Sequence, residues 1–108
     1  MSWNAFDNGK SIGQHGSEGG IIIRDEEHRD GARITLERDG HNAPLAITWG
    51  IYGWMCHTRF FGTEPEAQRE FETMRAELSK IVSTIPIATD PESRAVSDSL
   101  SEFVRRFP

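Results

Sequence analysis

Apolar and polar residues alternate most regularly in the segment 45–61. Leu45, Ile47, Trp49 and Ile51 are separated by smaller or polar residues, and this period of two is typical of a strand with one buried face. Residues 54–61 are again rich in aromatic residues, which suit a pleated surface. The pattern predicts a β-hairpin with a two-residue turn at Tyr52-Gly53.

The length of that turn fixes which side chains share a face. A two-residue turn places Trp49 opposite Cys56, and directly opposed residues lie on the same face of a sheet. Cys56 and Phe60 are then expected in the core, whereas His57 and Arg59 are expected on the other face. A slip of one residue would exchange the two faces of the second strand.

Two earlier segments, 20–24 and 32–38, also have the composition of strands. In the second, Ala32, Ile34 and Leu36 are expected to face inward, and the residues between them outward. The links 25–31 and 39–44 are short and contain glycine, which favours antiparallel pairing in chain order. Residues 1–19 are rich in glycine and are expected to form an irregular arm.

The period changes to that of a helix after residue 62. An apolar stripe at helical spacing predicts a helix from about residue 64 to 83, and Thr63 with Glu66 has the spacing of a capping box. The stripe consists of Ala67, Phe71, Met74, Leu78, Ile81 and Val82.

Asp90-Pro91 has the residue types that begin a helix and predicts a second one. Its apolar stripe reaches the end of the sequence, where burial within the chain is hardest. Two alternatives stay open: the helix docks on its own sheet, or its stripe is partly a partner interface. The interface residues are Leu100, Phe103, Val104 and Phe107.

The fold class that follows is α+β: a four-stranded antiparallel β-meander followed by two C-terminal α-helices packed on one face of the sheet. At 108 residues the chain is expected to be a single domain. Residues 1–19 form the arm, 20–62 the sheet and 63–108 the helices.

The composition indicates which partners and which cellular compartment to expect. The chain has 12 Lys+Arg and 17 Asp+Glu residues, a net charge of −5, and no basic patch suited to nucleic acid. We find no apolar run long enough to span a membrane, no signal-peptide pattern and a single cysteine. These features predict a cytoplasmic protein that contacts neither nucleic acid nor membrane.

No motif in the sequence specifies catalysis, a metal or a cofactor. The four histidines lack the spacing of a zinc site. Cys56 and His57 are adjacent, but on a strand they point to opposite faces and cannot act as a pair. The sequence therefore predicts no catalytic residues, no metal and no cofactor.

The outward face of the sheet is the best candidate for a ligand site. If Arg38 lies opposite Leu45, the register places Glu37, Thr48, His57 and Arg59 together on that face. A carboxylate, a hydroxyl, an imidazole and a guanidinium so placed suit an anionic or polar ligand. The alternative is that this face is the solvated side of an antiparallel sheet.

Three classes of function stay open. The first is a non-enzymatic protein-interaction module, self-associating as a homodimer, of the adaptor or immunity-protein type. The second is a small-molecule or anion-binding domain that uses the polar sheet face. The third is a small enzyme with His57 as general base. A concave polar face would favour the second or third class, and a flat wet face the first.

Overall fold

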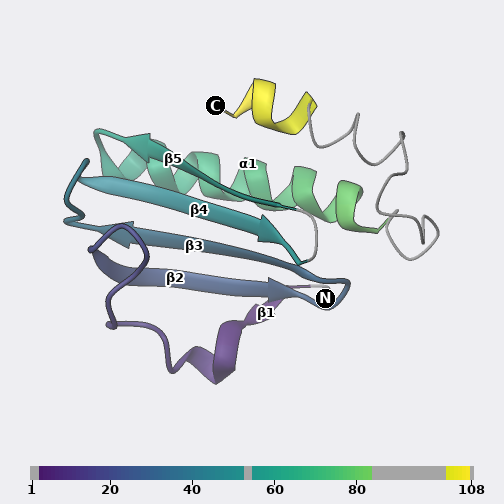
Figure 1. Ribbon diagram of the computed structural model, residues 1–108, viewed down its shortest axis with the longest axis horizontal. Helices are drawn as coiled ribbons and strands as arrows, with labels where there is room; N and C mark the ends of the chain where they lie inside the picture. The colour runs from purple at the N-terminus through teal and green to yellow at the C-terminus, as the bar shows by residue number, and fades with distance from the viewer. Residues whose placement is uncertain (1–2, 53–54, 84–101, 108) are drawn as a thin grey trace.

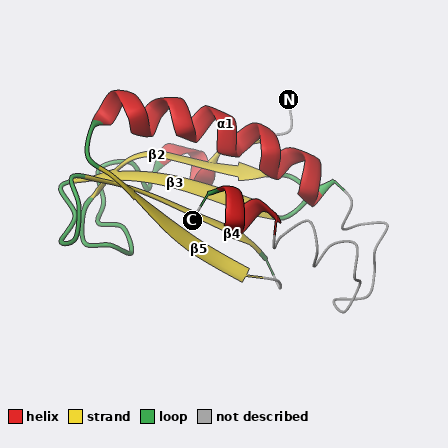
Figure 2. Ribbon diagram, turned by 90° about the horizontal axis from the view of Figure 1, so that it is seen from above, coloured by secondary structure: helices red, strands yellow, loops and turns green. Residues whose placement is uncertain are grey.

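The computed structural model describes residues 3–52, 55–83 and 102–107. Within them, five antiparallel strands form one open sheet in chain order, and a long helix lies across one face of it (Figures 1 and 2). The elements are β1 (Trp3–Ala5), β2 (Ile21–His28), β3 (Ala32–Arg38), β4 (Leu45–Ile51), β5 (Met55–Phe61) and α1 (Glu64–Val82).

The α+β class and the antiparallel meander are confirmed, but the sheet has one strand more than predicted. Trp3 pairs with His28, so the start of the predicted arm is an edge strand beside β2. The chain then makes a tight turn at Phe6–Gly9, where Asp7 and Asn8 have positive φ angles, and passes the face of the sheet opposite α1 before it enters β2. The arm is therefore built into the sheet.

The core lies between the sheet and α1. Ile34, Leu36 and Ile47 on the sheet and Phe71 and Met74 on the helix are fully buried. The inward-facing residues of β3 and the apolar stripe of α1 thus pack against each other, as the two periodicities predict.

Helix α1 matches its predicted range, whereas its predicted capping box is wrong. Thr63 is the N-cap residue with extended backbone, but its side chain makes no capping hydrogen bond. Pro65 stands in the first turn and has no N–H to donate, which removes one of the two usual partners of a capping side chain. The first helical bond runs from the Ala67 N–H to the Thr63 carbonyl, at 3.1 Å.

The predicted register between β4 and β5 is wrong by one residue. Ile51 pairs with Met55 and Trp49 with His57, so three residues rather than two connect the strands. The faces of β5 are therefore exchanged: Cys56 is exposed instead of buried, and Phe60 is 45% exposed. By contrast, the predicted register of β3 and β4 is confirmed, with Arg38 opposite Leu45.

Most of the predicted second helix lies outside the described residues, and so does Leu100 of the predicted interface. Residues 102–106 are helical. Phe103 and Phe107 are buried in the core of the chain itself, where the Phe103 ring meets Trp49 at 4.6 Å between centroids. Val104 is partly buried against the same core. The two phenylalanines are thus covered by their own sheet rather than exposed as a partner surface.

We expect Phe71→Ala to lower the free energy of unfolding by about 3 kcal/mol or more, because the fully buried ring would leave a cavity between α1 and the sheet. Arg69→Ala is the matched control on the exposed side of the same helix, with an expected change within about 0.5 kcal/mol. Denaturant unfolding measures both. Equal midpoints for the two variants would contradict the packing of Phe71.

Candidate functional site

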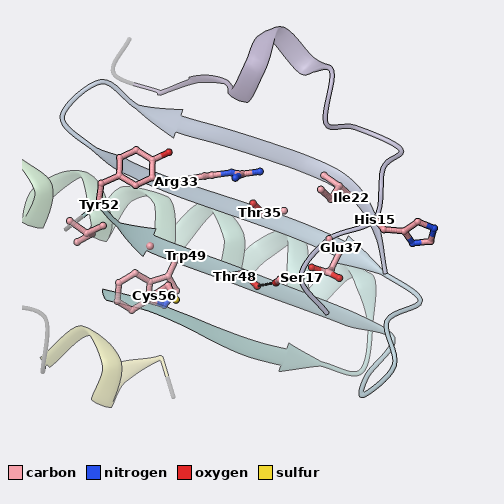
Figure 3. Close-up of a pocket in the computed structure, with 13 residues that line it drawn as sticks. His15, Ser17, Ile22, Arg33, Thr35, Glu37, Thr48, Trp49, Tyr52 and Cys56 are labelled. Atoms are coloured by element: carbon pink, nitrogen blue, oxygen red, sulfur yellow. Dashed lines mark hydrogen bonds between the residues drawn. The ribbon is translucent and has the colours of Figure 1, made fainter. Parts of the chain in front are cut away.

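The sheet face opposite α1 carries a cavity of about 440 Å³ between the strands and the N-terminal arm (Figure 3). Strand β3 supplies three polar side chains, and β4 supplies Thr48 and Gly50. The lining residues are His15, Gly16, Ser17, Ile22, Arg33, Thr35, Glu37, Thr48, Trp49, Gly50, Ile51, Tyr52 and Cys56. The face is therefore concave where a plain solvated sheet would be flat.

Glu37 lies at one end of the cavity and is only 1% exposed. Its Oε1 accepts hydrogen bonds from the backbone N–H of Gly20 at 2.9 Å and of Glu18 at 3.1 Å. Its Oε2 is buried and has no hydrogen-bond partner among the described residues. A Cβ on Gly16 would stand 2.4 Å from that oxygen, so glycine at this position lets the arm close over the carboxylate.

Arg33 lies toward the other end, held by the buried Asp25. Its Nε and Nη2 donate to the two Asp25 oxygens at 2.9 and 2.6 Å, and this hydrogen bonding to Asp25 raises the pKa of Arg33. Asp25 also accepts from the hydroxyls of Ser11 at 2.7 Å and Thr35 at 3.2 Å. The Phe6 ring covers the Arg33 guanidinium at 3.6 Å. The arm thus contributes both a hydroxyl and a ring to a neutral ion pair.

Hydroxyl groups occupy the middle of the site. The Thr48 hydroxyl lies 3.0 Å from that of Thr58 on β5 and 3.5 Å from that of Ser17 on the arm. At the Arg33 end, the Tyr52 hydroxyl donates to Glu27 at 2.8 Å. Desolvation by burial is the larger cause and this hydrogen bond the next, and together they raise the pKa of Tyr52 to about 12. Tyr52 therefore stays neutral at physiological pH.

The structure brings together only half of the predicted ligand-binding set. Glu37 and Thr48 line the cavity, whereas His57 and Arg59 lie on the α1 face because of the shifted register. His57 packs 6.1 Å from the Trp49 ring, and Arg59 forms an ion pair with Glu70 of α1 at 3.5 Å. Thr58, and not His57, lies beside Thr48 on the open face.

Sequence reasoning missed Arg33, Tyr52 and the arm. The alternation in β3 does place Arg33 on the same face as Glu37, and this signal was sufficient to include it. For Tyr52 the sequence predicts only a place in the turn after residue 51. No local pattern indicates that Ser11 and Phe6 reach Asp25 and Arg33, because these contacts join distant parts of the sequence.

A second cavity of about 700 Å³ lies between α1 and the start of the chain, beside His28. His28 Nε2 is 3.2 Å from the Ser79 hydroxyl, a separation that suits a base and a nucleophile. However, the Asp30 N–H donates to His28 Nδ1 at 3.0 Å. In the neutral ring the proton is therefore on Nε2, which donates to Ser79 and cannot accept its proton. This geometry does not activate Ser79.

Comparison of the chain with protein-family models, with curated proteins and with solved structures gives no match. Among the described residues there is no cluster of three or more histidine, cysteine or acidic side chains suited to a metal ion. In the same part of the chain, no helix has both the length and the apolar character needed to cross a membrane.

We expect His28 to make folding sensitive to acid. Burial lowers the pKa of His28, so the folded chain resists a proton that the unfolded chain accepts. The free energy of unfolding should therefore fall as the pH drops below about 6.5, until the folded pKa is reached. Urea unfolding of the wild type and His28→Gln at a series of pH values measures this contribution as the difference in slope.

Arg69→Ala, at an exposed residue of α1 that stays charged throughout this pH range, is the control and should keep the wild-type slope. Parallel pH profiles for the wild type and His28→Gln would contradict the contribution of His28.

Proposed function

We propose that this protein is a small-molecule-binding domain whose ligand occupies the cavity between the arm and the open sheet face. The observation that carries the proposal is Glu37, a buried carboxylate on the cavity wall with one oxygen that has no described partner. Buried polar atoms in native structures are nearly always hydrogen-bonded, so an orphan at a cavity wall indicates a missing partner. A ligand that donates a hydrogen bond supplies it.

The charges around the cavity favour a ligand with a donor group over a simple anion. Arg33 is neutralised by Asp25, which takes two of its N–H groups. Glu37 has no cation within ion-pairing distance among the described residues, and its charge is therefore not offset. A purely anionic ligand would meet that charge, whereas a hydroxyl or an ammonium group would satisfy it.

The size and construction of the cavity agree with this function. A volume of about 440 Å³ is in the range of small-molecule sites, which combine an apolar lining with a few convergent polar groups. The arm that forms one wall is fixed to β2 by backbone hydrogen bonds between Gly13, Gln14 and Ile22, at 2.8 and 2.9 Å. The wall is thus held in place by the chain's own hydrogen bonds.

We expect a library of small hydroxyl and amine compounds to contain members that shift the backbone amide signals of Glu18, Gly20 and Thr48 in NMR spectra. Gly50→Phe should abolish these shifts, because a ring at this position on the cavity wall fills the space. Lys80→Gln, on the α1 side of the molecule, is the control and should leave them intact. Binding that survives Gly50→Phe, or no shifts from any compound, would contradict the proposal.

Self-association through β5 is the second candidate function. Among the described strands β5 is an edge of the sheet, and it is seven residues long without proline or lysine. Edge strands of this kind are templates for pairing with another chain. Phe60 is 45% exposed on β5, which adds an apolar contact for a second copy. The other edge, β1, has only three residues.

If β5 pairs with β5 of a second copy, Phe60→Lys should lower the mass measured by light scattering from dimer to monomer. A lysine on an edge strand opposes pairing, because its charge would have to be desolvated against the second copy. Ile12→Lys is the matched control, since Ile12 is 46% exposed on the arm. A monomeric wild type at high concentration would exclude this candidate.

A further inference from the structure

The cavity has two polar ends of opposite chemistry, each with hydrogen-bonding capacity that the described residues do not use. At one end Glu37 Oε2 accepts no hydrogen bond from a described residue. At the other end Arg33 has five N–H groups, of which Asp25 takes two. No other hydrogen bond of Arg33 exists within the described part of the chain, and its side chain is 35% exposed. One end therefore offers an acceptor and the other a set of donors.

The position of Asp25 sets the separation of these two ends. Asp25 pairs with Thr35 across β2 and β3, so the Arg33 guanidinium leans along β3 to the level of Thr35. Thr35 and Glu37 are two residues apart on that strand, which corresponds to about 7 Å. This span corresponds to the length of about two amino-acid residues in extended form.

The middle of the cavity suits the uncharged part of a ligand. Thr48 and Ser17 present hydroxyls there, and hydroxyls can both donate and accept. Gly50 has no side chain, so the β4 backbone borders the cavity directly. Tyr52 adds a ring beside Arg33 (Figure 3). On the open face of β3 the residue between Arg33 and Glu37 in the sequence is Thr35, which carries no charge.

We infer that the ligand is a short zwitterion, an amino acid or a small peptide with free ends, whose ammonium group meets Glu37 and whose carboxylate meets Arg33. This inference rests on the proposed binding function of the same cavity. A simple amine would leave the Arg33 donors unused, and a simple carboxylate would leave Glu37 without a partner. A zwitterion satisfies both ends with charge-assisted hydrogen bonds, which are the stronger kind.

The inference is tested first on the wild-type protein with matched ligands. Alanine, dialanine and trialanine are titrated, together with dialanine that is N-acetylated, C-amidated or both. Isothermal titration and NMR shifts of the Glu18 and Thr48 amides report affinity and location. At least one unmodified compound should bind in the cavity, and each blocking group should weaken its binding about tenfold or more, since each removes one charge-assisted contact. The preferred chain length distinguishes an amino acid from a peptide.

Variants then assign each end of the ligand. Glu37→Gln should bind N-acetylated dialanine as tightly as free dialanine. It should still bind C-amidated dialanine more weakly than free dialanine. Arg33→Met should do the reverse. Gly16→Ala is a second route to the first result, because its Cβ would displace the Glu37 carboxylate without changing the charge. Lys80→Gln is the control and should leave the affinities for free and blocked dialanine in their wild-type ratios. NMR spectra without ligand confirm that each variant is folded.

The outcomes separate this inference from the proposed function. Equal binding of free and blocked dialanine at the cavity, or binding of neutral polyols or amines alone, overturns the zwitterion and leaves a small-molecule site. Failure of all these compounds and of the hydroxyl and amine library overturns both. Discrimination that persists unchanged in Glu37→Gln and in Gly16→Ala overturns the assignment of the ammonium group to Glu37.

Discussion

The alternation of side chains along β3 is the constraint on which both layers of this structure depend. Ile34 and Leu36 point toward α1 and are fully buried, while Thr35 and Glu37 point toward the arm and are also buried. A strand buried on both faces must satisfy its polar side chains within the protein. The arm supplies the hydrogen-bonding groups that allow this, and the cavity is the part of that polar layer which the arm leaves uncovered.

The sequence was informative wherever a periodic pattern met a long element. The α1 stripe follows from helical spacing, and it is confirmed. Alternation gives the faces of β3 and β4, and the register supposed for them, Arg38 opposite Leu45, is also confirmed. The β4–β5 register failed because Phe60 and Phe61 are adjacent, so either register puts a phenylalanine on the α1 face. His57 and Arg59 are tolerated on that face because β5 is at the edge of the sheet, where Arg59 reaches Glu70.

The cavity was predictable only in part. Its floor consists of strands with a periodic sequence pattern, whereas the arm that forms its wall has no such pattern. Glu37 and Thr48 follow from the register of the central strands. The wall depends on contacts between the arm and residues far along the sequence, such as Glu18 with Glu37. The role of Gly16 is visible only in the folded chain. A Cβ at this position would clash with the Glu37 carboxylate on β3, which is distant in the sequence.

The two buried carboxylates on the open face have different physical explanations. Asp25 accepts four hydrogen bonds, one from Ser11 of the arm and three from Arg33 and Thr35 of β3, so a structural role accounts for it fully. For Glu37 the same role accounts for Oε1, which binds two N–H groups of the arm, but not for Oε2. A glutamine at this position would give the arm the same acceptor but would bury an amide NH2 where Oε2 now lies, again without a partner. The proposed ligand donor accounts for the carboxylate, because it would supply the hydrogen bond that Oε2 lacks.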